Sequence, residues 1–215
     1  MTYALDALER RIDALFATPA GEPLEADAEA VVDALLARLE AGEVRSAVRA
    51  QGGRWSAVPW VKRGILVAFR AGKVVALGPD GLPAETPDAP APLLDKHTLP
   101  VRHFRPEERV RIVPGGSSVR RGAYVAPGVV CMPPMYINVG TWIGADTMID
   151  SHALVGSCAQ VGARVHLSAA AQIGGVLEPV NAAPVVVEDD VVVGGNAGVY
   201  EGTIVRRGAV LGAGV

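Results

Sequence analysis

The sequence predicts a parallel β-helix over its second half and a small, mostly helical domain before it. Two observations carry this prediction: an aliphatic residue recurs at every sixth position from Val119 onward, and a small or β-branched residue recurs four positions after it. Neither an α-helix nor an alternating strand has this period, whereas hexapeptide repeats are typical of β-helices. The repeat positions are Val119, Val125, Cys131, Ile137, Ile143, Ile149, Val155, Val161, Leu167 and Ile173, and then Val187, Val193, Val199, Val205 and Leu211.

The repeat also defines the geometry of the coil. Three stretches of six residues form one triangular layer, so each layer points one aliphatic side chain per face into a dry central column. Small residues such as Ala123 and Ala153 fill the space beside that column. Each layer pairs only with its neighbours, as in any solenoid. The spacing does not give the hand of the coil, but hexapeptide helices are left-handed as a class, and we expect a left-handed parallel β-helix.

The first hundred residues have a different pattern. The expected elements, in order, are a helix over 4–16, a helix over 27–39, a strand over 44–49, a turn at 52–53 and a helix over 59–69. Residues 79–92 are rich in proline, glycine and acidic residues, which is typical of a surface loop. We therefore expect a mostly helical domain over 1–109, with a proline-rich linker at about 79–100, followed by the β-helix domain over 110–215.

Composition and charge argue against several classes of function. The chain has 215 residues, is 50% hydrophobic and has a formal net charge of −3, so no basic excess indicates a nucleic acid or an anionic membrane as partner. The sequence shows neither a secretory signal nor an apolar stretch long enough to cross a bilayer. The two cysteines, Cys131 and Cys158, lie at different phases of the repeat and do not indicate a disulfide framework. We expect a soluble, cytoplasmic protein.

One interruption of the period stands out. Ile173 and Val187 are fourteen residues apart, two more than two repeats, so the register slips between them. The intervening residues 175–184 are expected to form a loop that projects from a corner of the coil. Such a loop can mark the binding face of a solenoid, or it can be a harmless insertion.

Two segments are more specific than the repeat itself, Gly156-Ser157-Cys158-Ala159-Gln160 and Gly174-Gly175-Val176-Leu177-Glu178-Pro179. Together with other segments they resemble the tetrahydrodipicolinate N-succinyltransferase family, which acts in the diaminopimelate branch of lysine biosynthesis. The resemblance covers residues 1–215. The other matching segments are 55, 59–60, 67–70, 110–114, 136–140, 147–150 and 165–168.

The resemblance implies an activity and an assembly. It implies an acyl-CoA-dependent N-acyltransferase that transfers a succinyl group to the amine of tetrahydrodipicolinate. The cosubstrate would be succinyl-CoA, with no permanently bound cofactor, and no CoA-contacting residue is assigned. It also implies a homotrimer of left-handed β-helices, with active sites between neighbouring coils.

The resemblance further implies two site residues, Asp150 and Arg111. Acyl transfer to an amine requires a base near the nitrogen and cations for the substrate's carboxylates. Asp150 matches the family's acidic residue that contacts the amine, and Arg111 matches an arginine that binds a substrate carboxylate, for which its fork is suited. Without the resemblance, a corner carboxylate that caps a turn and a solvated arginine would be the ordinary interpretations.

Two departures from the family pattern leave questions open. A second acidic residue of the family aligns with Gly198, which carries no carboxylate. Glu201, three residues later, is a candidate for an acid, base or site-lining group, although it belongs to another phase of the coil. The segment 168–172 lacks the family's glycine-rich run, so acetyl-CoA is an alternative donor to succinyl-CoA.

The histidines of the coil suggest one further candidate. His152 lies two residues after Asp150, and some hexapeptide acetyltransferases use a histidine as base. A zinc enzyme of the carbonic anhydrase type would need three histidine ligands, and His152 and His166 are too few and wrongly spaced. No metal is expected.

Two alternatives to the succinyltransferase interpretation remain. One is an N-acetyltransferase that acts on the same or a related amino dicarboxylate, and the other is a non-catalytic, trimeric binding paralogue. The chain also ends in mid-repeat after Leu211, so we expect the β-helix to be truncated at its C-terminal end.

Overall fold

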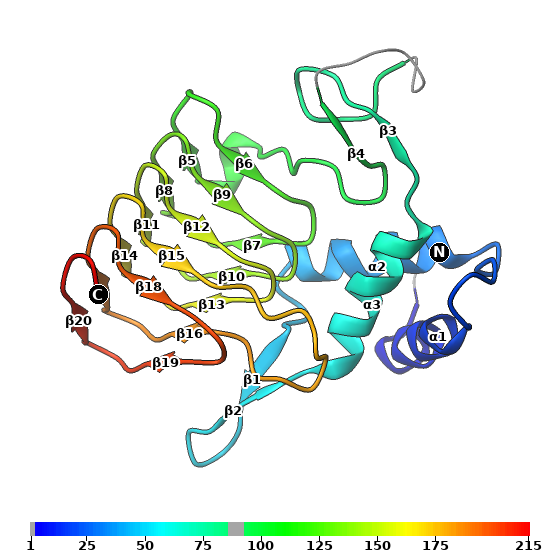
Figure 1. Cartoon of the computed structure of the whole chain (residues 1–215), viewed down its shortest axis with the longest axis horizontal. Helices are drawn as coiled ribbons and strands as arrows, with labels where there is room; N and C mark the ends of the chain where they lie inside the picture. The colour runs from blue at the N-terminus through cyan, green and yellow to red at the C-terminus, as the bar shows by residue number, and fades with distance from the viewer. Residues whose placement is uncertain (1–2, 86–92) are drawn as a thin grey trace.

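A computed structural model describes residues 3–85 and 93–215 and contains a parallel β-solenoid with a helical part at one end (Figure 1). The solenoid consists of strands of two residues each, which form three parallel sheets. The first sheet has the order β5-β8-β11-β14-β17-β20, the second β6-β9-β12-β15-β18 and the third β7-β10-β13-β16-β19. The predicted β-helix and the helical part before it are confirmed.

Each strand contributes one inward and one outward side chain. The bounds are β5 Arg111–Ile112, β6 Ser118–Val119, β7 Tyr124–Val125, β8 Val130–Cys131, β9 Tyr136–Ile137, β10 Trp142–Ile143, β11 Met148–Ile149, β12 Leu154–Val155, β13 Gln160–Val161, β14 His166–Leu167, β15 Gln172–Ile173, β16 Val186–Val187, β17 Val192–Val193, β18 Gly198–Val199, β19 Ile204–Val205 and β20 Val210–Leu211. Strands of successive layers pair in register, for example Ile143 with Val161. Inward apolar residues therefore stack on one another from layer to layer, whereas the outward residues differ.

The core is the column of aliphatic side chains that the period predicts. Ile137, Ile143, Ile149 and Val161 are completely buried, and the small residues four positions later, such as Ala153, are buried beside them. The third position after the aliphatic residue turns the corner with a positive φ, as at Asp146 (57°) and His152 (63°). Layers are therefore defined by an inward aliphatic residue, a left-handed corner and a small buried residue.

The helical part has its own apolar cluster, which extends onto the first layers of the coil. It contains α1 (Leu5–Ala17), α2 (Ala28–Glu40) and α3 (Pro59–Ala71), whose apolar faces meet through side chains such as Leu35 and Ile65. Two residues of the coil, Val139 and Cys158, belong to the same cluster. The three predicted helices agree with the observed ones to within two residues at each end.

Two short antiparallel pairs complete the helical part. The hairpin of β1 (Ala47–Arg49) and β2 (Trp55–Ala57) agrees with the predicted strand and turn. The pair of β3 (Val74–Ala76) and β4 (Leu94–Lys96) was not predicted, and β4 lies inside the segment expected to be a linker. Residues 86–92, in the middle of that segment, lie outside the described residues. A short 3-10 helix, η1 (Pro106–Glu108), precedes the solenoid.

Ion pairs join the helical part to the entrance of the coil. Arg121 contacts Asp33 and Glu40 of α2 at 2.7 and 3.2 Å, and Arg120 pairs with Asp95 of β4. The Glu40 carboxylate also accepts the backbone N–H of Gly122 at 2.8 Å. The arginine pair at this corner therefore orients the helices on the solenoid.

The interruption after Ile173 is larger than the expected slip of two residues. β15 and β16 are consecutive strands on adjacent faces, the positions that β12 and β13 occupy one layer earlier. Six residues separate Val155 from Val161, but fourteen separate Ile173 from Val187, so the loop adds eight residues within a single corner. The predicted loop exists, and its expected size was wrong.

No helix within residues 3–85 and 93–215 has the length and apolar character needed to span a membrane.

Because the aliphatic column is the core, replacing a buried valine should lower the free energy of unfolding much more than replacing an exposed one. Val193→Ala removes two methyl groups from a fully buried position and is expected to lower the free energy of unfolding by about 2 kcal/mol. Val48→Ala, in the exposed face of β1, is the control and should change it by less than about 0.5 kcal/mol. Urea unfolding followed by circular dichroism measures both. Equal effects would contradict the assignment of the column as the core.

Candidate functional site

Asp150 lies at the corner that follows β11. Its neighbour Ile149 is completely buried, so Asp150 is the first outward residue after the strand. One carboxylate oxygen, Oδ1, accepts the backbone N–H of Ser151 at 2.7 Å, which fixes the side chain to the turn. The side chain is 33% exposed, and its other oxygen, Oδ2, has no hydrogen bond among the described residues. One oxygen is therefore used for positioning, and the other is available for a substrate.

His166 is the group nearest to that free oxygen. It lies outward on β14, in register with Met148 of β11, and its Nε2 is 4.0 Å from Asp150 Oδ2. The Nε2 atom is buried and has no hydrogen-bond partner within the described part of the chain. The separation is too long for a hydrogen bond but is closed by a small rotation of either side chain. Asp150 and His166 can thus act as a carboxylate–imidazole pair.

His166 was not among the predicted site residues, although the sequence contains a signal for it. Stacked residues of this coil are eighteen positions apart, as Met148 and His166 are. Adding one layer to the strand that precedes Asp150 would have identified His166 as its neighbour. Sequence proximity favoured His152 instead.

Arg111 lies on the same sheet as Asp150, two strands away. It is outward and exposed on β5, which pairs with β8, and β8 pairs with β11. Two strand spacings correspond to roughly 10 Å. Within residues 3–85 and 93–215, Arg111 has no ion-pair partner, so its guanidinium is available for a ligand. The structure therefore brings Arg111 and Asp150 to one face.

Glu201 and His152 have other positions. Glu201 follows β18 of the second sheet, so within one chain it lies at a different corner of the triangle from Asp150. His152 is exposed at the left-handed corner between β11 and β12, and its backbone N–H donates to the carbonyl of Pro134. Neither forms a side-chain hydrogen bond or ion pair within the described ranges.

The ring of Tyr200 lies beside Gly198. A Cβ at position 198 would meet Cε2 of this ring. Tyr200 is itself 53% exposed, so its ring can move away, and the contact does not account for the glycine.

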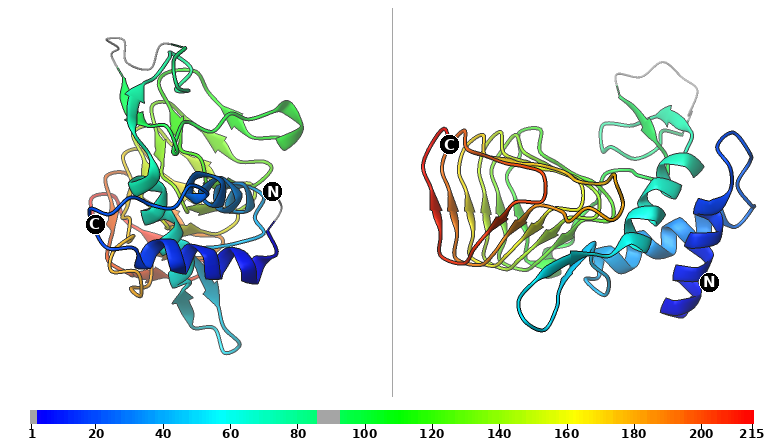
Figure 2. Two further views of the ribbon diagram at one scale, coloured as in Figure 1. Left: turned by 90° about the vertical axis from the view of Figure 1, so that its right-hand side faces the viewer. Right: turned by 60° about the horizontal axis from the view of Figure 1, so that its bottom comes forward.

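The loop of residues 174–185 projects toward α3 (Figure 2). The side chain of Lys62, on α3, is completely buried, and its Nζ donates to the carbonyl oxygen of Ala182 at 2.6 Å. Burial lowers the pKa of Lys62 below its ordinary value. Leu177 packs on the apolar cluster of the helical part. The loop is thus held by the hydrogen bond from Lys62, by the backbone hydrogen bond from Val176 to Ser157 and by apolar contacts of Leu177 and Val176.

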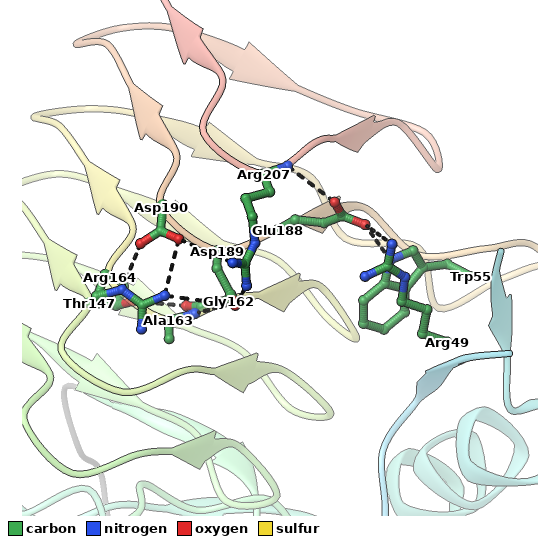
Figure 3. Close-up of polar contacts among 10 residues, drawn as sticks. All are labelled: Arg49, Trp55, Thr147, Gly162, Ala163, Arg164, Glu188, Asp189, Asp190 and Arg207. Atoms are coloured by element: carbon green, nitrogen blue, oxygen red, sulfur yellow. Dashed lines mark hydrogen bonds and ion pairs between the residues drawn. The ribbon is translucent and has the colours of Figure 1, made fainter. Parts of the chain in front are cut away.

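A polar cluster occupies the corner after β16 (Figure 3). Glu188 accepts hydrogen bonds from Trp55 Nε1 at 3.1 Å and from the Arg207 backbone at 3.1 Å. Burial alone would raise the pKa of Glu188, but these donors and the nearby arginines outweigh it and hold the pKa below its ordinary value. Asp189 accepts the backbone N–H of Ala163 at 3.0 Å and pairs with Arg207 at 2.5 Å. The cluster joins three layers of the coil and the β1–β2 hairpin.

A cavity of about 370 Å³ lies beside this cluster, between the hairpin and the outer face of the third sheet. Its lining contains Arg45, Trp55 and Trp142, and none of the predicted residues Arg111 and Asp150. The cavity is therefore separate from the Asp150 corner.

The two cysteines are buried. Cys131 and Cys158 are free thiols, and burial raises the pKa of each to about 12, so neither is a thiolate at neutral pH. Within the described ranges, no three histidine, cysteine or acidic side chains lie close enough together to hold a metal ion.

Comparison with known proteins relates both parts of the chain to one family. Residues 7–71 match the family profile described as the tetrahydrodipicolinate N-succinyltransferase N-terminal domain, and residues 184–215 match the hexapeptide repeat of succinyl-transferase. The chain is 41% identical over 219 residues to the 2,3,4,5-tetrahydropyridine-2,6-dicarboxylate N-succinyltransferase of Paramagnetospirillum magneticum, covering 100% of this chain and 75% of that protein. Proteins of the same name from Nitrobacter hamburgensis and Bradyrhizobium diazoefficiens are 39% and 40% identical, and each alignment covers 99% of this chain and 74% of the relative.

The burial of Lys62 predicts a pH-dependent contribution to stability. Because the pKa of Lys62 is lowered on folding, the unfolded chain binds more protons than the folded one between the folded pKa and the ordinary value. The free energy of unfolding of the wild type, relative to Lys62→Met, is therefore expected to rise as the pH is raised toward that value. Urea unfolding at pH 7 and pH 9.5 measures it. Lys73→Met, at an exposed lysine, is the control and should show no such rise; a pH-independent difference for Lys62→Met would contradict the assignment.

Proposed function

Since the chain belongs to the tetrahydrodipicolinate N-succinyltransferase family, we propose that its reaction takes place on the outer face of the first sheet, beside Asp150. The chain is an acyltransferase that transfers a succinyl group to tetrahydrodipicolinate in the diaminopimelate route to lysine. The observation that carries the proposed location is the free Oδ2 of Asp150, 4.0 Å from the unpartnered Nε2 of His166.

The reaction requires a base at the substrate nitrogen. The ring nitrogen of tetrahydrodipicolinate is an imine, so water adds to the ring before the nitrogen can act as an amine. The amine then attacks the thioester carbonyl, a C–N bond forms, the C–S bond breaks, and coenzyme A leaves as the thiol. The amine proton must pass to a base as the bond forms. Asp150 is proposed as this base because one of its oxygens is anchored and the other is free.

His166 is proposed to position and support Asp150. A small rotation of either side chain would bring the imidazole Nε2 into hydrogen-bond contact with Asp150 Oδ2 and hold the carboxylate in one orientation. The register of β14 on β11 holds His166 one layer from Asp150. His166 thus acts through Asp150 and not on the substrate directly.

Arg111 is proposed to bind one carboxylate of the substrate. Its guanidinium is exposed, lies on the same sheet and has no protein carboxylate to neutralise it within the described ranges. A fork of this kind pairs with a carboxylate through two parallel hydrogen bonds. β5 and β11 are two strand spacings apart, roughly 10 Å.

Glu201 remains a candidate for a subsidiary role, and His152 is not given one. Glu201 lies at another corner of the same chain, so it could reach an Asp150 site only from a neighbouring coil. This arrangement accords with a homotrimer whose sites lie between coils, which we propose as the assembly. Succinyl-CoA is the proposed cosubstrate, and a cytoplasmic location follows as a proposal because acyl-CoA thioesters are cytoplasmic metabolites.

Replacement of Asp150 tests the proposed base. Asp150→Asn keeps the hydrogen bond from Ser151 but removes the base, and it is expected to lower kcat by about 100-fold or more with an unchanged circular dichroism spectrum. The assay follows free thiol with tetrahydrodipicolinate and either succinyl-CoA or acetyl-CoA. Asp146→Asn, at the preceding exposed corner, is the matched control and should retain full activity.

The outcomes of this assay also separate the alternatives. Faster thiol release with acetyl-CoA than with succinyl-CoA would favour the N-acetyltransferase alternative. No thiol release from the wild type with either donor would favour the non-catalytic paralogue, for which the absence of a carboxylate at Gly198 is the argument.

A second pair of variants distinguishes the two histidines. His166→Gln is expected to lower kcat by about tenfold with little change in KM, and to alter the acid limb of the pH–rate profile, because it acts through Asp150. His152→Gln should leave both constants close to the wild type. The reverse result, loss of activity in His152→Gln alone, would make His152 the base and contradict the role given to His166.

A further inference from the structure

The cavity between the β1–β2 hairpin and the third sheet has the features of a binding site. The hairpin lies beside the coil (Figure 2), and residues from both sides line a space of about 370 Å³. Part of its wall, with Arg49, Trp55, Glu188 and Arg207, is seen in Figure 3. The volume is within the range of small-molecule sites. The charged side chains that line it differ in whether they have an ion-pair partner in the protein.

Arg45 is a lining cation of the cavity that has no direct ion pair among the described residues. Its guanidinium carbon lies 3.9 Å from the centre of the Trp142 ring and 5.5 Å from that of Trp55. Its Nε donates to Gln160 Oε1 at 3.0 Å, but within residues 3–85 and 93–215 its terminal nitrogens have no hydrogen-bond acceptor and no carboxylate partner. Burial lowers the pKa of Arg45 to about 10. A desolvated charge without a counter-ion is costly to maintain.

The position of Arg45 is fixed by groups that the fold has already ordered. Gln160 is 1% exposed, and its Nε2 donates to Ser46 Oγ and to the Cys158 carbonyl at 2.9 Å each. Its Oε1 is thereby turned toward Arg45. The Trp142 ring beneath the guanidinium is stacked on Tyr124, with centroids 3.9 Å apart. Gln160 therefore holds the guanidinium at Nε, and the Trp142 ring supports its face. Its two outer nitrogens make no hydrogen bond within the described residues.

The other charges of the cavity are already paired. Arg49 is 3.6 Å from Glu188, and Arg207 is 2.5 Å from Asp189. Glu188 also accepts from Arg206 at 3.0 Å. Among the described residues, Arg45 is therefore the lining cation without a carboxylate in ion-pair contact, although Asp189 lies near enough to attract it, and it stands next to two indole rings.

We propose that this cavity binds a small organic carboxylate with a flat apolar body. The carboxylate would pair with the two outer nitrogens of Arg45, and the body would pack against Trp142 and Trp55. This site is distinct from the Asp150 corner, because it lies on the outer face of a different sheet. Its occupation would link the hairpin to the coil and is a means by which a metabolite could stabilise the junction of the two parts.

Benzoate and benzamide are suitable probes because they share a flat ring and differ in charge. Calorimetric titration of the full chain with benzoate is expected to show one site, and tryptophan fluorescence should change because Trp142 and Trp55 line the cavity. Benzamide should bind at least about tenfold more weakly, because it lacks the charge that Arg45 would pair with. Equal binding of both probes, or no binding of benzoate, would overturn the proposal.

Three variants identify the arginine responsible. Arg45→Gln is expected to weaken benzoate about tenfold or more, and Arg45→Lys, which keeps the charge in the folded cavity but not the fork, should weaken it less. Arg54→Gln is the matched control, at an exposed arginine of the same hairpin that does not line the cavity, and should bind benzoate as the wild type does. Loss of binding in Arg111→Gln with retention in both Arg45 variants would place benzoate at the Asp150 face and overturn the proposal. If Arg45→Gln fails to fold by circular dichroism, the Arg45→Lys variant and the two probes on the wild type still decide it.

Discussion

The burial of one aliphatic side chain per strand is the interaction on which the rest of this structure depends. Each strand is only two residues long, too short to be stable by itself, and gains its stability from the strands above and below. The inward residues, such as Ile143 and Ile149, align these short strands into a continuous column. Because the column fixes the backbone, every outward residue of a given phase is placed at a known height on a known face. The site residues are positioned in this way: Arg111, Asp150 and His166 are outward residues at defined layers of one sheet.

The second constraint is the junction between the helical part and the coil. It combines an apolar contact, in which Val139 and Cys158 join the helical core, with ion pairs of Arg120 and Arg121. On another side the hairpin is joined through Arg45, Gln160 and Glu188. The same junction that orients the two parts therefore also encloses the cavity, and a ligand there would contact both of them at once.

The fold could be predicted from the sequence because the repeat directly reflects which side chains are buried. The aliphatic residue, the small residue and the corner each return with the same period, and the structure has them buried or exposed as that period requires. The loop after Ile173 was the exception. A separation of fourteen residues is compatible with two repeats plus two residues or with one repeat plus eight, and only the pairing of β15 and β16 with their neighbours distinguishes these counts. Strand β4 was missed for another reason, since three residues within a polar segment carry no periodic signal.

The candidate site was less predictable than the fold. Asp150 and Arg111 came from the resemblance to a family, and the structure adds that they share a sheet. His166 could have been found from the eighteen-residue stacking period, which places it one layer from Met148. Arg45 could not, because its partner Trp142 is ninety-seven residues away along the chain and the contact depends on the docking of the hairpin.

The eight-residue loop has a consequence for how such a chain can vary in length. The strands on either side of it keep the register of the layers above and below, although the numbering has shifted by more than one repeat. A change in the length of one corner therefore does not shift the pairing of the layers that follow. Insertions and deletions at a corner change the surface of one layer and leave the height of every later residue unchanged, so a coil of this type can acquire new loops without losing the alignment of its existing functional faces.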